Sequence, residues 1–129
     1  MFTVEQISAA HSKVKSGADF PAYIQEIRGM GVTHYETYVS DGHIDYHGGG
    51  GYTAGVPAKY EPLLVADKAE SDRFRAELLA HQQGKSDFLS FIKSCAALGI
   101  DKWEVRMDRM ECTYYDKSGN VVLVESIPQ

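Results

Sequence analysis

Two stretches of the chain decide the fold: "DFPAYIQEIRGMGVTHYETYVSDGHIDYHGGGG" at 19–51 and "DFLSFIKSCAALGIDKWEVRMDRMECTYYDKSGN" at 87–120. Set one above the other without a gap, they share these identical residues: Asp19/Asp87, Phe20/Phe88, Ile24/Ile92, Gly31/Gly99, Glu36/Glu104 and Tyr46/Tyr114. Several positions between these pairs keep their apolar or aromatic character. Self-similarity at a fixed spacing is the signature of a repeated structural unit. We therefore predict two tandem copies of one unit.

Periodicity predicts the structure of each unit. Apolar residues at helical spacing indicate two helices, and Thr3 and Asp19 are expected to cap the two helices of the first copy. Alternation then predicts three strands, with "SDG" at 40–42 as a tight turn between the first two. The strands of the first copy are expected at 33–39, 43–47 and 51–55. The elements of the second copy are expected at 68–83 and 87–98 (helices) and at 102–107, 111–115 and 121–125 (strands).

Each unit has the order ααβββ, and a linker at 58–67 joins the first unit, 2–57, to the second, 68–129. A unit of about 60 residues buries too little surface to be very stable alone, so the two should share one core in a single domain, 1–129. We predict an α+β fold, with an antiparallel sheet and helices packed on one face. The sequence leaves open whether the strands form one sheet or two.

Composition narrows the class of protein. Hydrophobic content of 43% and charged content of 24% are ordinary for a soluble globular chain. The net charge of −5 and the absence of a basic stripe argue against a nucleic-acid partner. No apolar run reaches the roughly 18 residues of a membrane helix, and the first residues do not resemble a secretory signal. Cys95 and Cys112 are too few for a disulfide framework, so we expect them reduced and buried in a cytoplasmic protein.

The first predicted hairpin carries a dense set of polar side chains. Alternation, with "DG" as the centre of the turn, places Glu36 opposite His47 and puts these residues on one face: His34, Glu36, Tyr38, His43, Asp45 and His47. Such nitrogen and oxygen donors suit Zn²⁺, Fe²⁺ or Mn²⁺, and the candidate ligands are His34, Glu36, His43, Asp45 and His47. Exposed faces of antiparallel sheets are polar in any case, and the second copy keeps only Glu104. We therefore expect a partly exposed, solvated or partner-facing surface without metal or other cofactor.

The four glycines at 48–51 raise the question of a phosphate-binding loop. Such a loop leads into a helix N-terminus, whose N–H groups face the anion. Residues 52–57, "YTAGVP", instead indicate a strand and a turn. We expect a hairpin turn here, as at "DKSGN" in the second copy.

The second copy also carries a resemblance to a known family. A helix with Phe leads through Gly-Ile into an aromatic strand in "DFLSFIKSCAALGIDKWEVRM"; "CTYYDKSGN" and "VVLVESIP" follow. This pattern resembles a bacterial domain-of-unknown-function family of small proteins labelled "phage envelope protein". The shared motifs belong to the fold and imply no catalytic residues. The resemblance implies a prophage context in some genomes.

Two classes of function are open. The first is a non-enzymatic binding or interaction protein, which would form a homodimer through an exposed edge strand such as 121–125. The second is a small-molecule binder or enzyme with a cleft between the two copies. Glu36 and Glu104 would then meet as a ligand-binding carboxylate pair able to do acid–base chemistry. No activated nucleophile is visible in the sequence, which favours the first class.

Overall fold

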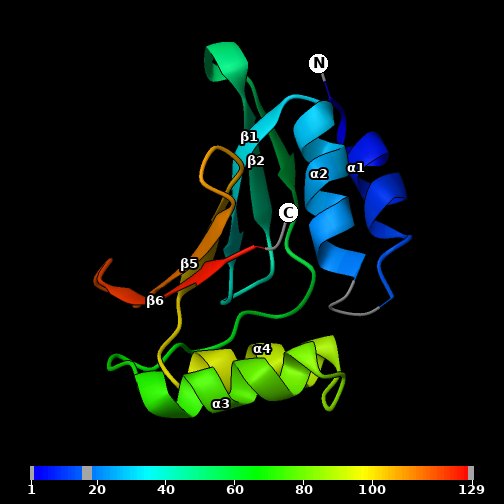
Figure 1. Ribbon diagram of the computed structural model, residues 1–129. Helices are drawn as coiled ribbons and strands as arrows, with labels where there is room; N and C mark the ends of the chain where they lie inside the picture. Colours follow the sequence, from blue (N-terminus) through cyan, green and yellow to red (C-terminus); the bar gives the residue numbers. More distant parts are fainter. Residues whose placement is uncertain (1, 16–18, 128–129) are drawn as a thin grey trace.

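The computed structural model describes residues 2–15 and 19–127, which fold into four α-helices and a six-stranded sheet (Figure 1). The first half contains α1 (Val4–His11), α2 (Phe20–Gly29), β1 (Val32–Tyr38), β2 (Ile44–Gly48), the 3₁₀ turn η2 (Gly49–Gly51) and β3 (Thr53–Val56). The second half contains α3 (Ser71–Gln82), α4 (Phe88–Ala97), β4 (Lys102–Arg106), β5 (Glu111–Tyr115) and β6 (Val121–Ser126). The predicted α+β class is confirmed, and the glycine tract forms the expected turn between two strands.

All six strands belong to one antiparallel sheet in the order β3-β2-β1-β4-β5-β6. Each half therefore forms a three-stranded meander, and the two meanders join through the pairing of β1 with β4 at the centre. This answers the question of one sheet or two. The tandem-repeat interpretation stays a prediction, and the matching order of elements in the two halves supports it.

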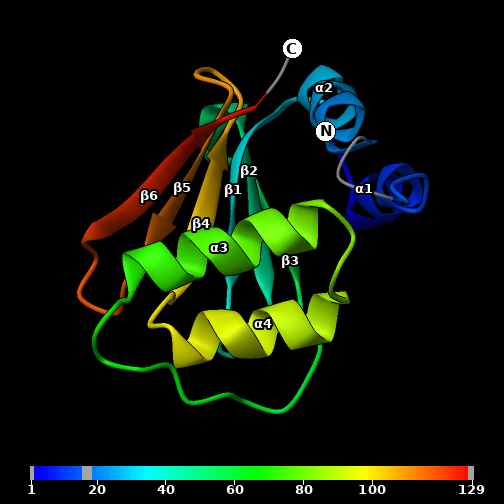
Figure 2. The same cartoon turned by 60° about the horizontal axis from the view of Figure 1, so that its bottom comes forward.

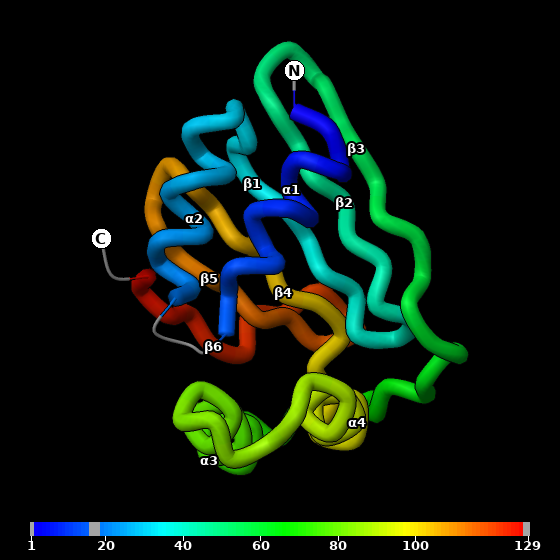
Figure 3. The backbone as a smooth tube through the Cα atoms, turned by 90° about the vertical axis from the view of Figure 1, so that its right-hand side faces the viewer, coloured from blue at the N-terminus to red at the C-terminus, as the bar shows by residue number. Residues whose placement is uncertain are grey.

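The helices cover one face of the sheet, as predicted (Figure 2). α1 packs beside α2, and these helices contact β3 and β1 respectively; α3 packs beside α4 and contacts β6. Figure 3 shows α1 and α2 lying side by side in front of the strands, with α3 and α4 below them. None of the helices in the described ranges has the length and apolarity needed to cross a membrane.

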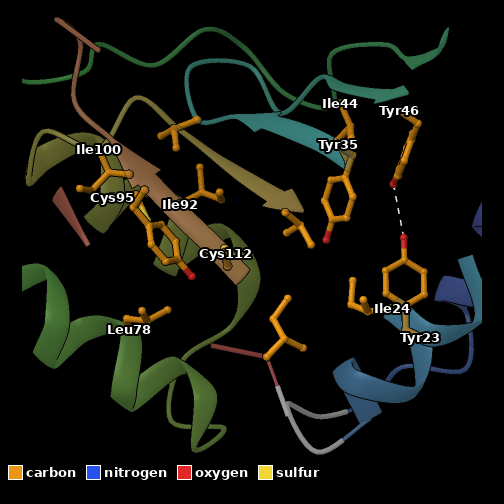
Figure 4. Close-up of a cluster of buried hydrophobic side chains, with 14 of the residues drawn as sticks. Tyr23, Ile24, Tyr35, Ile44, Tyr46, Leu78, Ile92, Cys95, Ile100 and Cys112 are labelled. Atoms are coloured by element: carbon orange, nitrogen blue, oxygen red, sulfur yellow. Dashed lines mark hydrogen bonds between the residues drawn. The ribbon is translucent and has the colours of Figure 1, made fainter. Parts of the chain in front are cut away.

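One hydrophobic core fills the space between the helices and the sheet, and it draws side chains from both halves of the chain (Figure 4). In the first half, the Tyr23 hydroxyl of α2 lies 3.4 Å from that of Tyr46 on β2. In the second half, Cys112 of β5 faces the helices in the same core, together with Ile92 and Cys95 of α4. The apolar face of the sheet is thereby buried against the helices, and most polar strand residues lie on the opposite face.

Of the two predicted helix caps, Thr3 at α1 is confirmed and Asp19 at α2 is not. Asp87 caps α4, and its carboxylate accepts a hydrogen bond of 2.7 Å from the backbone N–H of Ser90. Asp19 does not cap α2, because its own backbone is already helical (φ −87°, ψ −11°) and its carboxylate accepts from the Lys15 N–H instead. The predicted cap at Asp19 is therefore wrong.

The turn between β1 and β2 is longer than the sequence suggests. Tyr38 donates its backbone N–H to the carbonyl of His43, and Gly42 donates to the carbonyl of Tyr38 with a φ of +79°. Val39 leaves the hairpin and donates to the carbonyl of Asp101. The pairing of β1 with β2 consequently differs by two residues from the prediction. Since side chains alternate with period 2, a shift by two leaves every residue on its predicted face.

Candidate functional site

The face of the sheet opposite to the helices carries polar and aromatic side chains, and we call it the free face. Within the described part of the chain, no helix or strand covers it. One row of cross-strand neighbours consists of Thr53, His47, His34, Arg106, Glu111 and Ser126. A second row consists of Gly55, Asp45, Glu36, Glu104, Thr113 and Val124. A third row consists of His43, Tyr38, Lys102, Tyr115 and Val121.

The structure places the five residues named as metal ligands on this face, all of them partly exposed: His34, Glu36, His43, Asp45 and His47. The pairing within the hairpin corrects one expectation. His34, not Glu36, lies opposite His47, and Glu36 lies opposite Asp45. The longer turn described above is the cause. His47 therefore reaches Glu36 along a diagonal of the ladder, a separation that long side chains span.

Three of the five side chains form one cluster. The Nε2 atom of His47 lies 2.5 Å from Oε1 of Glu36, and the imidazole rings of His34 and His47 are stacked with centroids 4.3 Å apart. One donor atom from each of His34, Glu36 and His47 lies within 4.8 Å of the other two. We call these three residues the His–Glu–His cluster. Two imidazoles and a carboxylate are a ligand set found in zinc and iron sites.

The electrostatics of the cluster favour a neutral His34. Burial lowers the pKa of His34, and the neighbouring imidazole of His47 lowers it further. Glu104 and Glu36 act in the opposite direction and only partly offset these effects. A neutral imidazole keeps a lone pair on one ring nitrogen, which is the form that binds a metal ion.

His43 and Asp45 lie outside this cluster. His43 Nδ1 lies 2.6 Å from a carboxylate oxygen of Asp41, and its ring stacks on Tyr38 at 4.1 Å. The carboxylate of Asp41 also accepts a hydrogen bond from the backbone N–H of His43. Both contacts with His43 lower the pKa of Asp41, and the backbone hydrogen bond has the larger effect. Asp45 lies 4.0 Å from His43 Nε2. The predicted five-residue set is therefore divided into a cluster of three and two residues outside it. Of these two, His43 contacts Asp41 of the turn, and Asp45 lies on β2.

Glu36 and Glu104 are direct partners in the β1–β4 ladder, at the centre of the sheet. The carboxylate of Glu36 is well supplied with partners, since Oε2 lies 3.4 Å from the Tyr38 hydroxyl and 3.9 Å from Lys102 Nζ. Its side chain is 18% exposed. Burial, followed by the charge of Glu36, raises the pKa of Tyr38. The two glutamates are ladder partners on an open face, not in a cleft, and their action as a carboxylate pair stays a prediction.

One residue of the site was not found by sequence reasoning. The Thr33 hydroxyl lies 3.0 Å from Nδ1 of His34 and donates to the backbone carbonyl of His47 at 3.1 Å. Thr33 belongs to the place where the β1–β2 pairing becomes irregular, between Val32 and His34. Strict alternation would turn its side chain away from the free face. The irregularity is what brings its hydroxyl to His34, and alternation alone cannot reveal it.

Two hollows are present elsewhere on the described surface. One, of about 240 Å³, lies between the linker and α4, and is lined by Leu64, Val65, Ala66, Asp67, Ala96, Ala97 and Lys117. The other, of about 270 Å³, is lined by Arg28, Gly31, Val32, Thr33, Met107 and Asp108. The second hollow lies between the two halves but includes neither Glu36 nor Glu104. Both are smaller than the roughly 300–1,000 Å³ typical of small-molecule sites.

The comparisons with known proteins concern the family alone. A family model described as "Protein of unknown function (DUF1398)" matches residues 8–126, which is nearly the whole chain. A search of curated proteins gave no match.

Proposed function

The chain belongs to this family of proteins of unknown function (DUF1398), and we propose that it is a non-enzymatic interaction protein that pairs with a second copy of itself through strand β6. The observation that carries the proposal is the state of the two sheet edges. A strand at an edge presents unpaired backbone groups, which another chain can use to extend the sheet.

Strand β6 is an open edge of the sheet and is mostly apolar in sequence. It pairs with β5 alone and exposes Val121 and Val124, which are 58% and 48% accessible to solvent. Its sequence, "VVLVES", contains no lysine and no proline. Natural edge strands commonly carry such residues to prevent pairing. The one charged residue of β6, Glu125, lies opposite the buried Cys112, and the pairing of β6 with β5 is irregular near Tyr115. We take the length and apolar sequence of this six-residue edge to favour association.

The opposite edge, β3, is shorter and less suited to pairing. It has four residues, contains Gly55 and is followed directly by Pro57. Glycine weakens a strand, and proline cannot donate a hydrogen bond to a neighbouring strand. Association is therefore expected at one edge only, which gives a closed dimer and not a filament. Two β6 strands related by a two-fold axis would make one continuous sheet from both copies.

The non-enzymatic part of the proposal has support in the described residues. Both cysteines are free and buried, and burial raises the pKa of the Cys95 and Cys112 thiols. A catalytic thiolate requires the opposite, a lowered pKa in a partly exposed position. The two hollows described above are small and do not contain the polar clusters of the free face.

The oligomeric state of two edge variants tests the proposal. Val124→Lys places a charge on β6, and Thr53→Lys places the same charge at an exposed position of β3. Size-exclusion chromatography with light scattering should show a dimer for the native chain and for Thr53→Lys, and a monomer for Val124→Lys. A native chain that is monomeric at several hundred micromolar would overturn the proposal, as would an equal effect of both variants.

We also propose a cytoplasmic, prophage-associated protein. The two unpaired cysteines suit a reducing compartment, and the prophage context follows from the resemblance of the second half to proteins labelled "phage envelope protein". Fractionation of the native host, with immunodetection before and after prophage induction, provides the test. Recovery of the protein from the membrane or extracellular fraction would contradict the cytoplasmic location. An unchanged protein level after induction would contradict the association with a prophage.

A further inference from the structure

We infer that the His–Glu–His cluster is a binding site for one divalent transition-metal ion, with His34, Glu36 and His47 as its protein ligands. The inference replaces the sequence-based expectation of a face without metal, because the structure brings donor atoms of three of the five candidate ligands within 4.8 Å of one another. It goes beyond the proposed function, since an ion can bind to a single copy without any pairing of β6. Zn²⁺ and Fe²⁺ are the ions that two imidazoles and one carboxylate serve best.

The distances within the cluster fit an ion after a small adjustment. Zinc binds imidazole nitrogen at about 2.0–2.1 Å and carboxylate oxygen at about 2.0–2.2 Å, so neighbouring donors around it lie about 3 Å apart. His47 Nε2 and Glu36 Oε1 lie 2.5 Å apart, and all three donor atoms lie within 4.8 Å of one another. Rotation of partly exposed side chains supplies the remaining change. The ion would replace the direct contact between His47 and Glu36.

Thr33 prepares His34 for this role. Its hydroxyl hydrogen is donated to the carbonyl of His47, so the hydroxyl oxygen is left to accept a hydrogen bond from Nδ1–H of His34. The proton of the neutral imidazole is then on Nδ1, and Nε2 carries the free lone pair. Ligating histidines in proteins usually donate their other ring N–H in this way. Thr33 is therefore a positioning residue for the site.

The second oxygen of Glu36 is held in a similar manner. Oε2 faces the Tyr38 hydroxyl and Lys102 Nζ, which leaves Oε1 directed at His47. Hydrogen bonding of the non-ligating oxygen orients a metal-binding carboxylate. His34 and Glu36 thus each have an orientation set by hydrogen-bonding or charged neighbours that an ion would not displace. The His47 ring is stacked on His34, and its contact with Glu36 is the one that an ion would replace.

The charge around the cluster also favours a cation. The free face carries four carboxylates, Asp45, Glu36, Glu104 and Glu111, against two basic side chains. One of the basic side chains, Arg106, is drawn toward Asp108 by hydrogen bonds of 3.2 and 3.0 Å. The face therefore has an excess of negative charge, which attracts divalent cations.

The test is calorimetric titration of Zn²⁺ into the full chain after treatment with a chelator. We expect one ion per chain. Its affinity should fall in each of His34→Ala, His47→Ala and Glu36→Gln by more than the roughly 10- to 100-fold that the loss of an outer-shell partner costs. The matched control is His43→Ala, which removes a histidine from the same face without touching the cluster, and its affinity should equal that of the native chain. Circular dichroism verifies the fold of each variant.

Thr33→Val provides an independent readout that does not depend on removing a ligand. The variant keeps the shape of the side chain and removes the hydroxyl, so it should weaken Zn²⁺ binding. In the zinc-free native protein, the nitrogen-15 chemical shifts of His34 should be those of an Nδ1–H tautomer, and the variant should change them. In the native protein, zinc binding should change the nitrogen-15 chemical shift of His34 Nε2.

Two results would overturn the inference: no stoichiometric binding by the native chain, or an equal loss in His43→Ala and His47→Ala, the mark of an adventitious surface ion. Neither result bears on the pairing of β6, which is measured without metal.

Discussion

At the scale of single residues, the opposed carboxylates at the centre of the sheet lead to a prediction about stability. Glu36 and Glu104 face each other in the β1–β4 ladder, and like charges in that position repel. We expect Glu104→Gln to raise the free energy of unfolding by about 0.2–1 kcal/mol at pH 7. Urea denaturation of both proteins measures the difference.

The control for this prediction lies on the neighbouring strand. Glu111 faces Arg106 in the β4–β5 ladder, so Glu111→Gln removes an attraction and should leave stability unchanged or lower it. A similar gain in stability from both variants would show that general negative charge, and not the opposition of Glu36 and Glu104, is responsible.

The cysteines lead to a second prediction for single residues. Burial raises the pKa of Cys112 to about 12, and it also raises the pKa of Cys95. Both thiols should therefore be protonated and inaccessible at pH 8. A disulfide reagent that reports free thiols should react with neither cysteine in the folded chain and with both in guanidinium. Rapid reaction of the folded chain would refute the buried placement.

The face of each residue could be predicted from the sequence, whereas the neighbours across the strands could not. Alternation alone places His34, Glu36 and His47 on one face. Their pairing depends on the length of the turn, and "SDG" indicated a shorter turn than the one that closes at Tyr38 and His43. The role of Thr33 could not be predicted either, because it depends on the irregular pairing between Val32 and His34.

At the scale of the elements, the glycines that follow α3 and α4 have similar left-handed backbone angles but different surroundings. Gly99 (φ +83°) follows α4, and a Cβ there would lie 2.5 Å from the Lys68 carbonyl oxygen. Gly84 (φ +78°) follows α3 and has open space around it. We expect Gly84→Ala to cost about 1–2 kcal/mol from the left-handed backbone alone.

Gly99→Ala should cost clearly more, because the backbone of Lys68 and Ala69 must also move away. Thermal and urea unfolding of the two variants give the comparison. Equal losses would mean that the segment before α3 does not pack against the end of α4, contrary to the hydrogen bond that the Glu70 N–H donates to the Leu98 carbonyl.

Most elements could be predicted because their signals are local. Helical spacing indicated the helix that became α4, and alternation indicated the strands. The cap at Asp19 was wrong because capping depends on the backbone angles of the capping residue, which identical letters at Asp19 and Asp87 do not determine.

At the scale of the whole molecule, the order of the strands was beyond the reach of the sequence. The similarity of the two halves predicts what each contains, but not that β1 and β4 meet at the centre. That pairing leaves β3 and β6 as the edges, and β6 is the longer and more apolar of the two. The proposed function therefore depends on a property of the assembled sheet that no single segment carries.

Hydrogen–deuterium exchange as a function of protein concentration tests the pairing of β6 most directly. Amides that bond to a second copy exchange slowly only when the dimer is populated. We predict that residues 121–126 become more protected as the concentration rises from below one micromolar to several hundred micromolar, while residues 53–56 of β3 do not change. Equal exchange of residues 121–126 at both concentrations would contradict the account.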